Sequence, residues 1–193
     1  PRLHRSKFAQ LSGMGIQSIH DVPDDFPLTD RQATVRQCVM SGETFSSVHL
    51  KKKLESVSWP AHYLDFETVM TAIPLYESVA PYEQVVVQYS VHTCRMPGDI
   101  LTHTEYLAEP SRDCREELAT LLLSVLHGKG SIVTYSGFEA TIIKGLSRHC
   151  PSKADDLLSL LSRIVDLEKI IRENYYHQEF HGRTSIKTTL PIL

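Results

Sequence analysis

Residues 61–69 have the sequence Ala-His-Tyr-Leu-Asp-Phe-Glu-Thr-Val, and this stretch decides the fold. Its period of two predicts a β-strand in which Leu64 and Phe66 face a core while Asp65 and Glu67 share the opposite face. Two neighbouring carboxylates repel each other unless a cation neutralises them, and their oxygen atoms suit Mg²⁺ or Mn²⁺. An exposed strand face with two solvated acids is the simpler interpretation, so the pair alone does not decide the chemistry.

Two further strands are predicted after this one, at residues 85–93 (VVVQYSVHT) and 100–108, joined by the turn 96–99 into an antiparallel hairpin. Ser111 is predicted to cap a helix with an apolar stripe from Leu118 to Leu126. The remaining elements are predicted as strand 131–135, helix 138–149, helix 154–162, strand 164–167 and helix 168–175. This order predicts an α/β fold with a mixed sheet, three antiparallel strands followed by parallel strands with right-handed crossovers. Helices flank the sheet.

Residues 1–58 read as short helices, one beginning at Thr29 and ending at Ser41-Gly42. We interpret them as a helical N-terminal extension or linker before a domain at residues 59–193. The chain begins with Pro1 and ends in Pro-Ile-Leu, and we expect it to be part of a longer polypeptide.

Composition excludes several classes of protein. The 193 residues include 20 Lys plus Arg against 23 Asp plus Glu, which is typical of one globular domain and argues against indiscriminate binding to nucleic acid. Collagen-like, disordered and disulfide-rich classes are excluded, and no apolar run is long enough to span a membrane. The four cysteines occur singly, which favours a reducing compartment, and we predict a cytoplasmic location.

A second acidic feature is the run Tyr-Ser-Gly-Phe-Glu at residues 135–139, where a strand turns into a helix. We expect Gly137 to permit a tight turn and Glu139 to point toward the carboxyl edge of the sheet, where ligands of open α/β sheets gather. The helix dipole alone would also favour an acid there. Asp166, on the next predicted strand, adds a fourth acid.

The other motifs in the sequence do not indicate one particular chemistry. Gln88, Ser90 and His92 alternate on one face of the second strand and either line a site or contact solvent. His177-x-x-x-His181 has a zinc-like spacing without a cysteine pair. His181 either approaches the acidic site or is a surface-loop histidine, which is the simpler interpretation. Cys150 has no partner histidine motif for nucleophilic catalysis, and no phosphate-binding loop, dinucleotide fingerprint or Gly-x-Ser-x-Gly occurs.

Six motifs together resemble one bacterial family, called domain of unknown function 2779. They occur in the family's order and span about residues 58 to 193: 63–68, 73–76, 81–84, 88–92, 163–167 and 185–191. That family in turn resembles the ribonuclease H-like 3′–5′ exonucleases of the proofreading type, which bind two metal ions with four acids.

The resemblance implies a ribonuclease H-like fold and assigns roles to particular residues. Asp65 and Glu67 match the first exonuclease motif and Glu139 the second, so these three are the implied metal ligands, with Asp166 as a supporting catalytic acid. Glu139 stands where the superfamily has Asp, and Ser136 or Gly137 where it has Asn. The implied substrate contacts are Thr68, Tyr82, Gln84, Gln88, Phe138, Arg183 and Lys187.

The implied activity is metal-dependent hydrolysis of phosphodiester bonds at single-stranded nucleic-acid ends, in the 3′–5′ direction, with two Mg²⁺ or Mn²⁺ ions. The acid of the third motif would lie beyond Leu193, so we expect residues 1–193 to bind the second metal ion weakly and to hydrolyse slowly. A catalytically weak or inactive module is the alternative: it would bind nucleic acid or an upstream nuclease module of the same polypeptide. A purely structural domain would instead pair Asp65 or Glu67 with Arg or Lys. Membrane partners are not expected, while the choice of DNA or RNA and the oligomeric state stay open.

Overall fold

The computed structural model describes residues 3–99 and 101–193. The chain forms two compact units, one made of Pro1–Leu54 with Glu168–Leu193 and the other of Glu55–Leu167. Within the described residues, no helix has the length and apolar character required to cross a membrane.

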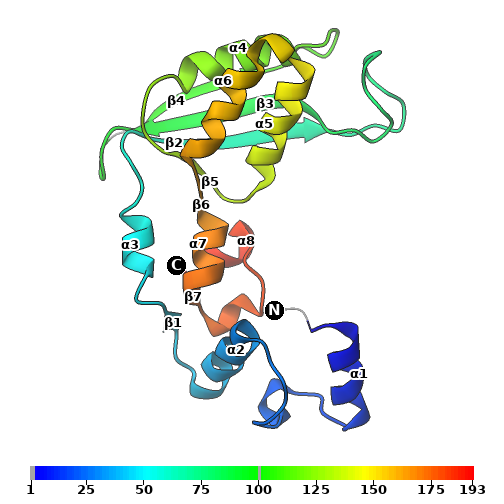
Figure 1. Ribbon diagram of the computed structural model, residues 1–193, viewed down its shortest axis with the longest axis vertical. Helices are drawn as coiled ribbons and strands as arrows, with labels where there is room; N and C mark the ends of the chain where they lie inside the picture. The colour runs from blue at the N-terminus through cyan, green and yellow to red at the C-terminus, as the bar shows by residue number, and fades with distance from the viewer. Residues whose placement is uncertain (1–2, 100) are drawn as a thin grey trace. The chain divides into compact units, whose positions relative to one another are not determined.

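The larger unit is built on a five-stranded mixed sheet (Figure 1). Its strands are β2 (Ala61–Val69), β3 (Val85–Cys94), β4 (Thr102–Leu107), β5 (Ile132–Thr134) and β6 (Ile164–Asp166), in the order β4-β3-β2-β5-β6. β3 pairs antiparallel with both β2 and β4, while β5 pairs parallel with β2 and β6 parallel with β5. The predicted mixed sheet, with antiparallel strands first and parallel strands afterwards, is confirmed. Residue 100 of the third predicted strand lies outside the described residues.

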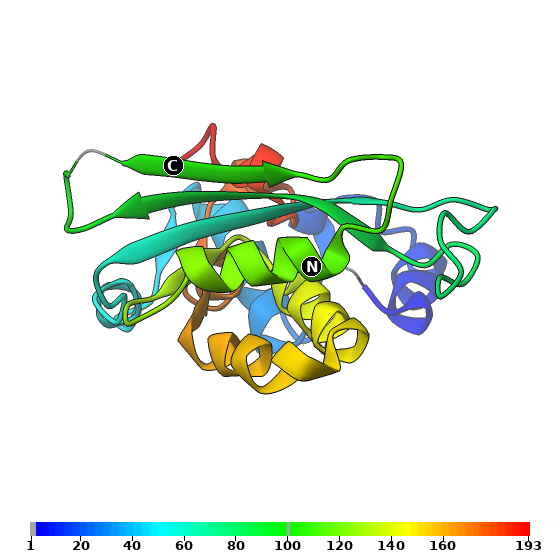
Figure 2. The same ribbon diagram turned by 90° about the horizontal axis from the view of Figure 1, so that it is seen from above.

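Three helices of this unit cover the same face of the sheet (Figure 2). They are α4 (Arg115–Val125), α5 (Phe138–His149) and α6 (Ala154–Leu160), the last flanked by the 3₁₀ turns η2 (Pro151–Lys153) and η3 (Leu161–Arg163). Leu64 and Phe66 of β2 pack with Leu118, Leu122 and Ile143 in one buried cluster. Apolar alternation in β2 therefore fixes which face receives the helices, and it leaves the other face polar.

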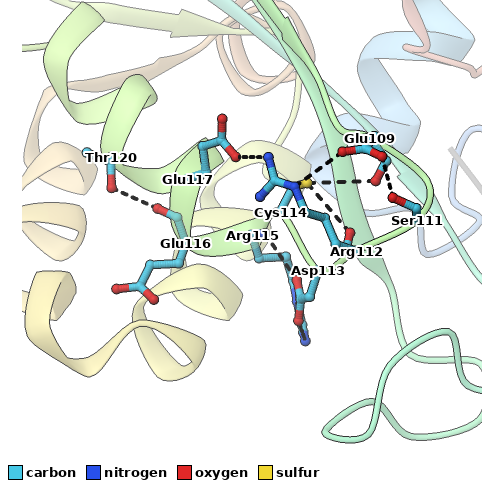
Figure 3. Close-up of polar contacts among 9 residues, drawn as sticks. All are labelled: Glu109, Ser111, Arg112, Asp113, Cys114, Arg115, Glu116, Glu117 and Thr120. Atoms are coloured by element: carbon cyan, nitrogen blue, oxygen red, sulfur yellow. Dashed lines mark hydrogen bonds and ion pairs between the residues drawn. The ribbon is translucent and has the colours of Figure 1, made fainter.

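The start of α4 differs from the prediction. Ser111 lies four residues before the first helical residue and does not cap this helix. Its hydroxyl donates to the Glu109 carboxylate instead. Cys114 is the N-cap residue and makes no side-chain capping bond. The Asp113 carboxylate instead accepts the Arg115 amide at 3.1 Å, which closes a side-chain turn just outside the helix (Figure 3). Asp113, and not Ser111, is therefore the polar residue whose side chain bonds the backbone at the start of α4.

The loop before β5 is locked to neighbouring segments. The Arg163 guanidinium donates to the carbonyl oxygens of Leu126, Lys129 and Gly130 at 2.6, 3.2 and 2.8 Å. Gly130 has φ of +102°, and a Cβ atom there would lie 2.0 Å from the carbonyl oxygen of Pro60. These contacts satisfy the exposed carbonyls at the end of α4 and align β5 beside β2.

The smaller unit consists of short elements. They are α1 (Arg5–Gly13), η1 (Ile19–Asp21), α2 (Asp30–Ser41), β1 (Phe45–Ser46), α3 (Leu50–Leu54), α7 (Leu167–Asn174), β7 (Tyr175–Tyr176), η4 (Gln178–Phe180) and α8 (Ile186–Thr189). The predicted limits of α2 are confirmed: a capping box joins Thr29 to Gln32, and Gly42 ends the helix at φ of +72°. β1 and β7 form an antiparallel pair that was not predicted, since two residues are too few to show a period.

Candidate functional site

Asp65 and Glu67 lie on the face of β2 that no helix of the larger unit covers. Both are exposed, whereas Leu64 and Phe66 between them are 4% and 3% exposed. Asp65 stands opposite Ser90 of β3, and Glu67 stands opposite Gln88 just before a β-bulge. Neither acid pairs with Lys or Arg of the described residues, so the ion pair that would mark a structural domain is not found.

Glu139 enters the site from the first turn of α5. After β5 the Thr134 hydroxyl donates to the Ser136 carbonyl at 3.0 Å, and the Ser136 hydroxyl accepts the Phe138 amide at 3.2 Å. These bonds turn the chain. Gly137, which we expected to permit the tight turn, has φ of −76°, which any residue adopts, so the turn does not depend on the conformational freedom of glycine. Glu139 is only 5% exposed, and its Oε2 atom has no hydrogen-bond partner among the described residues.

The surroundings of Glu139 oppose its ionisation. Burial raises the pKa of this carboxyl group, and the charges of Asp65 and Asp166 raise it further, although the backbone amides of Glu139 and Ser136 act the other way. β2, β5 and β6 are parallel, so their carboxyl ends lie at one edge of the sheet. Asp65 and Asp166 are therefore near enough to this edge for their charges to act on Glu139, while the assignment of all three as one catalytic site stays a prediction. Glu67 is not among the charges that shift the pKa of Glu139.

The donor chemistry of these residues fits a hard divalent cation. A buried carboxylate oxygen without a partner, beside two further carboxylates, is an uncompensated charge that Mg²⁺ or Mn²⁺ would neutralise. No three His, Cys, Asp or Glu side chains of residues 3–99 and 101–193 are already grouped closely enough to hold an ion. The arrangement thus supplies suitable oxygen ligands but not a closed cage.

The proposed substrate contacts within the larger unit occupy several places. Thr68 follows the bulge in β2, Gln88 lies half-buried opposite Glu67, and Phe138 packs against the main core. Tyr82 is 68% exposed in the loop before β3 and has a positive φ of 60°. Gln84, which is exposed, lines a pocket beside α5. Thr68 and Gln88 are therefore the two that flank the acids of β2.

Two basic candidates belong to the smaller unit. Arg183 and Lys187 are both exposed there. Their role as phosphate contacts stays a prediction.

The sequence reasoning missed a contribution from β4. His103 stacks on His92 of β3 with ring centroids 4.3 Å apart, and its Nε2 atom lies 3.0 Å from the Ser90 hydroxyl oxygen. Glu105, on the same strand, stands opposite Ser90 and thus in the same row as Asp65. Counting outward from the turn at residues 96–99 would have paired these positions, because the register of a hairpin follows from its turn.

Comparisons with known proteins identify the family of this chain. No curated protein and no solved structure matches it. Residues 62–185, which contain all the sheet strands of the larger unit except the first residue of β2, match the family described as a domain of unknown function, DUF2779. The match covers more than half of the chain and includes Asp65, Glu67, Glu139 and Asp166. The chain therefore belongs to the DUF2779 family.

Proposed function

We propose that the larger unit is a ribonuclease H-like, metal-dependent nuclease domain that acts as a 3′–5′ exonuclease on single-stranded nucleic-acid ends. The observation that carries this proposal is the buried, unpaired Oε2 atom of Glu139 beside the charges of Asp65 and Asp166. A purely structural role gives no reason to bury a carboxylate oxygen without a partner, because such a group costs about 1–3 kcal/mol. Functional sites commonly retain costs of this kind.

The topology supports the same proposal. The sheet has three antiparallel strands followed along the chain by two parallel strands. The resemblance to ribonuclease H-like proteins implies a sheet of this kind. The first acids lie on the central strand β2. Glu139 follows β5, and Asp166 is the last residue of β6, and both of these strands run parallel to β2. Ligands of open α/β sheets bind at such carboxyl edges.

Asp65, Glu67 and Glu139 would hold the divalent metal ions, and Asp166 would support them. When bound, the metal ions lower the pKa of a coordinated water and stabilise the negative charge that develops on the phosphate. Asp65 and Glu139 contribute their negative charge to that site and, when it is empty, repel an approaching phosphate. Gln88, opposite Glu67, would donate a hydrogen bond to the sugar or phosphate of a strand at this edge.

The test is hydrolysis of a labelled single-stranded oligonucleotide, as DNA and as RNA, in Mg²⁺, in Mn²⁺ and in a chelator. We expect slow, metal-dependent shortening from the 3′ end that Asp65→Asn abolishes. Glu105→Gln removes an exposed acid from the same row of the sheet and should keep the activity. Binding without any hydrolysis would favour the inactive nucleic-acid-binding module, and hydrolysis that survives Asp65→Asn would refute the assigned site.

A further inference from the structure

A second candidate site lies beside α5, on the side of the sheet that the helices cover. It is a pocket of about 580 Å³, which we call the α5 pocket, and its volume is within the range of small-molecule sites. Val86, Ile142 and Leu146 are buried core residues that form its apolar wall. Arg115 and Arg148 add positive charge to its lining, which also includes the His149 ring.

Arg115 is held rigidly at this pocket. Its Nε and Nη2 atoms donate to the Asp113 carboxylate at 3.0 and 2.6 Å (Figure 3). Nη2 also donates to the Ser78 hydroxyl at 3.2 Å. The guanidinium carbon also lies 5.9 Å from the centre of the Tyr76 ring. Only 7% of the Arg115 side chain is exposed, yet Nη1 has no partner among the described residues. A fixed guanidinium with one free nitrogen is pre-organised for an anion.

The acids near the pocket are already engaged. Asp113 pairs with Arg115 and lies 3.6 Å from His149, and although burial opposes its ionisation, Arg115 and His149 together lower its pKa. Glu83 lines the pocket, but its Oε2 atom accepts the Ala80 amide at 2.9 Å. Arg148 is exposed and has no ion pair with any described residue, so its guanidinium is available to a ligand at the pocket, whose lining also carries the charge of the Glu83 carboxylate.

Gly145 is the second, independent observation. It lies in the middle of α5, where glycine weakens a helix relative to alanine. A Cβ atom at Gly145 would meet no described atom within 4 Å, outside its own helix backbone and chain neighbours, so packing gives no reason for a glycine there. Gly145 lines the α5 pocket, and the missing side chain keeps that space open.

We propose that the α5 pocket binds a small organic phosphate, with its apolar body against Val86, Ile142 and Leu146 and its phosphate at Arg115 and Arg148. A phosphate group offers three terminal oxygens, which suits the donors of two arginines, His149 and the Ser78 hydroxyl better than the two oxygens of a carboxylate do. The α5 pocket lies apart from the acids Asp65 and Glu67, which project from the opposite face of β2, and it shares only Gln84 with the implied substrate contacts of the nuclease.

Titration calorimetry with adenosine 5′-monophosphate, inorganic phosphate and adenosine tests the proposal on the 193-residue chain. We expect saturable binding of the monophosphate, weaker binding of phosphate and none of adenosine. Arg148→Gln should weaken monophosphate binding about tenfold or more, as the loss of a charged hydrogen bond does. Lys144→Gln, which removes the same charge from an exposed position of α5 outside the pocket, should leave the affinity within about twofold.

A steric pair of variants tests the role of the glycine. Gly145→Leu should fill the pocket and abolish binding, while Gly145→Ala should keep binding and raise the melting temperature, since alanine favours the helix. Melting curves of every variant confirm that each is folded. Absence of saturable binding to the wild-type chain, or binding unaffected by both Arg148→Gln and Gly145→Leu, would overturn the proposal, whatever the nuclease assay shows.

Discussion

Burial at the start of α5 raises the pKa of Glu139, whose Oε2 atom has no partner among the described residues, and the charge of Asp65 on β2 raises it further. The two residues are 74 positions apart in the sequence, and parallel pairing of β2 with β5 brings them to one edge of the sheet. Asp166 adds to the same effect from the end of β6. A buried carboxyl group whose ionisation is disfavoured in this way implies a bound cation, a bound proton or a cost in stability, and each possibility can be measured.

Glu139→Gln should raise the stability of the metal-free chain at neutral pH. The folded-state pKa of Glu139 lies above its unfolded value of about 4.3, so the protonated carboxyl group is favoured by folding. Its contribution to the free energy of unfolding is therefore complete below about pH 4.3 and is lost as pH rises through the folded-state pKa. The variant and wild type should therefore have the same melting temperature near pH 4. As pH rises, the melting temperature of the variant should exceed that of wild type, by about 2–4 °C if the gain in the free energy of unfolding is ~1 kcal/mol. Melting curves from pH 4 to 8 in a chelator measure this difference. A variant less stable than wild type at pH 7 would contradict an uncompensated charge.

Asp65→Asn should separate metal binding from folding. Without metal it removes one of the like charges, so the melting temperature should stay unchanged or rise. With Mn²⁺ the wild-type chain should gain stability by mass action, and the variant should not. Nuclease activity should fall at least about 100-fold. Glu105→Gln, the exposed acid of the same cross-strand row, is the matched control and should behave as wild type. A large loss of stability in Asp65→Asn would mark Asp65 as a structural acid.

Much of the sheet could be predicted because its strands carry strong patterns. Residues 61–69 alternate so regularly that β2 has the predicted limits, and Phe138–His149 was predicted for α5 because its apolar residues recur at helical spacing. The prediction for the entry to α4 is wrong because Ser111 and Asp113 both have side chains that can cap a helix. Asp113 bonds Arg115 two residues on, and the long-range bond of Arg115 to Ser78, which no local pattern shows, holds that pair in place. β1 and β7 are more than 120 residues apart in the sequence, and a local sequence pattern cannot predict a pairing over that distance.

The candidate site was predictable in part for a similar reason. The acids of one strand share a face by simple alternation, whereas the burial of Glu139 and its unpaired oxygen depend on how α5 packs on the sheet. The α5 pocket could not be found from sequence at all. Arg115, Gly145 and Arg148 come from two helices, and their common pocket appears only once α4 and α5 are placed together.

Gly130→Ala should be among the most destabilising single substitutions in the larger unit. The added Cβ atom would lie 2.0 Å from the Pro60 carbonyl oxygen, and the backbone there has φ of +102°. The clash forces β5 away from the start of β2, so we expect a loss of about 3 kcal/mol or more in the free energy of unfolding. Gly128→Ala in the same loop is the control. Its φ is +87°, but an added Cβ atom would meet no described atom within 4 Å, so only the strain of a left-handed backbone should lower the free energy of unfolding, by about 1–2 kcal/mol. Urea unfolding of both variants measures the difference, and equal losses would mean that the close approach is not what requires glycine.

Arg163→Lys tests whether the fork of three hydrogen bonds, rather than positive charge, holds the α4–β5 loop. The guanidinium donates to the carbonyl oxygens of Leu126, Lys129 and Gly130 from three different nitrogens, and a lysine ammonium cannot reach all three carbonyls in that geometry. We expect a loss of about 1.5–3 kcal/mol by urea unfolding, the range for hydrogen bonds to a charged group. Arg95→Lys, at an exposed turn position, should change stability by less than about 0.5 kcal/mol. Arg163→Met keeps the aliphatic stem but no donor, so it should lose more than Arg163→Lys. If lysine restored wild-type stability, charge alone would stabilise the loop and the separate carbonyl bonds would contribute little.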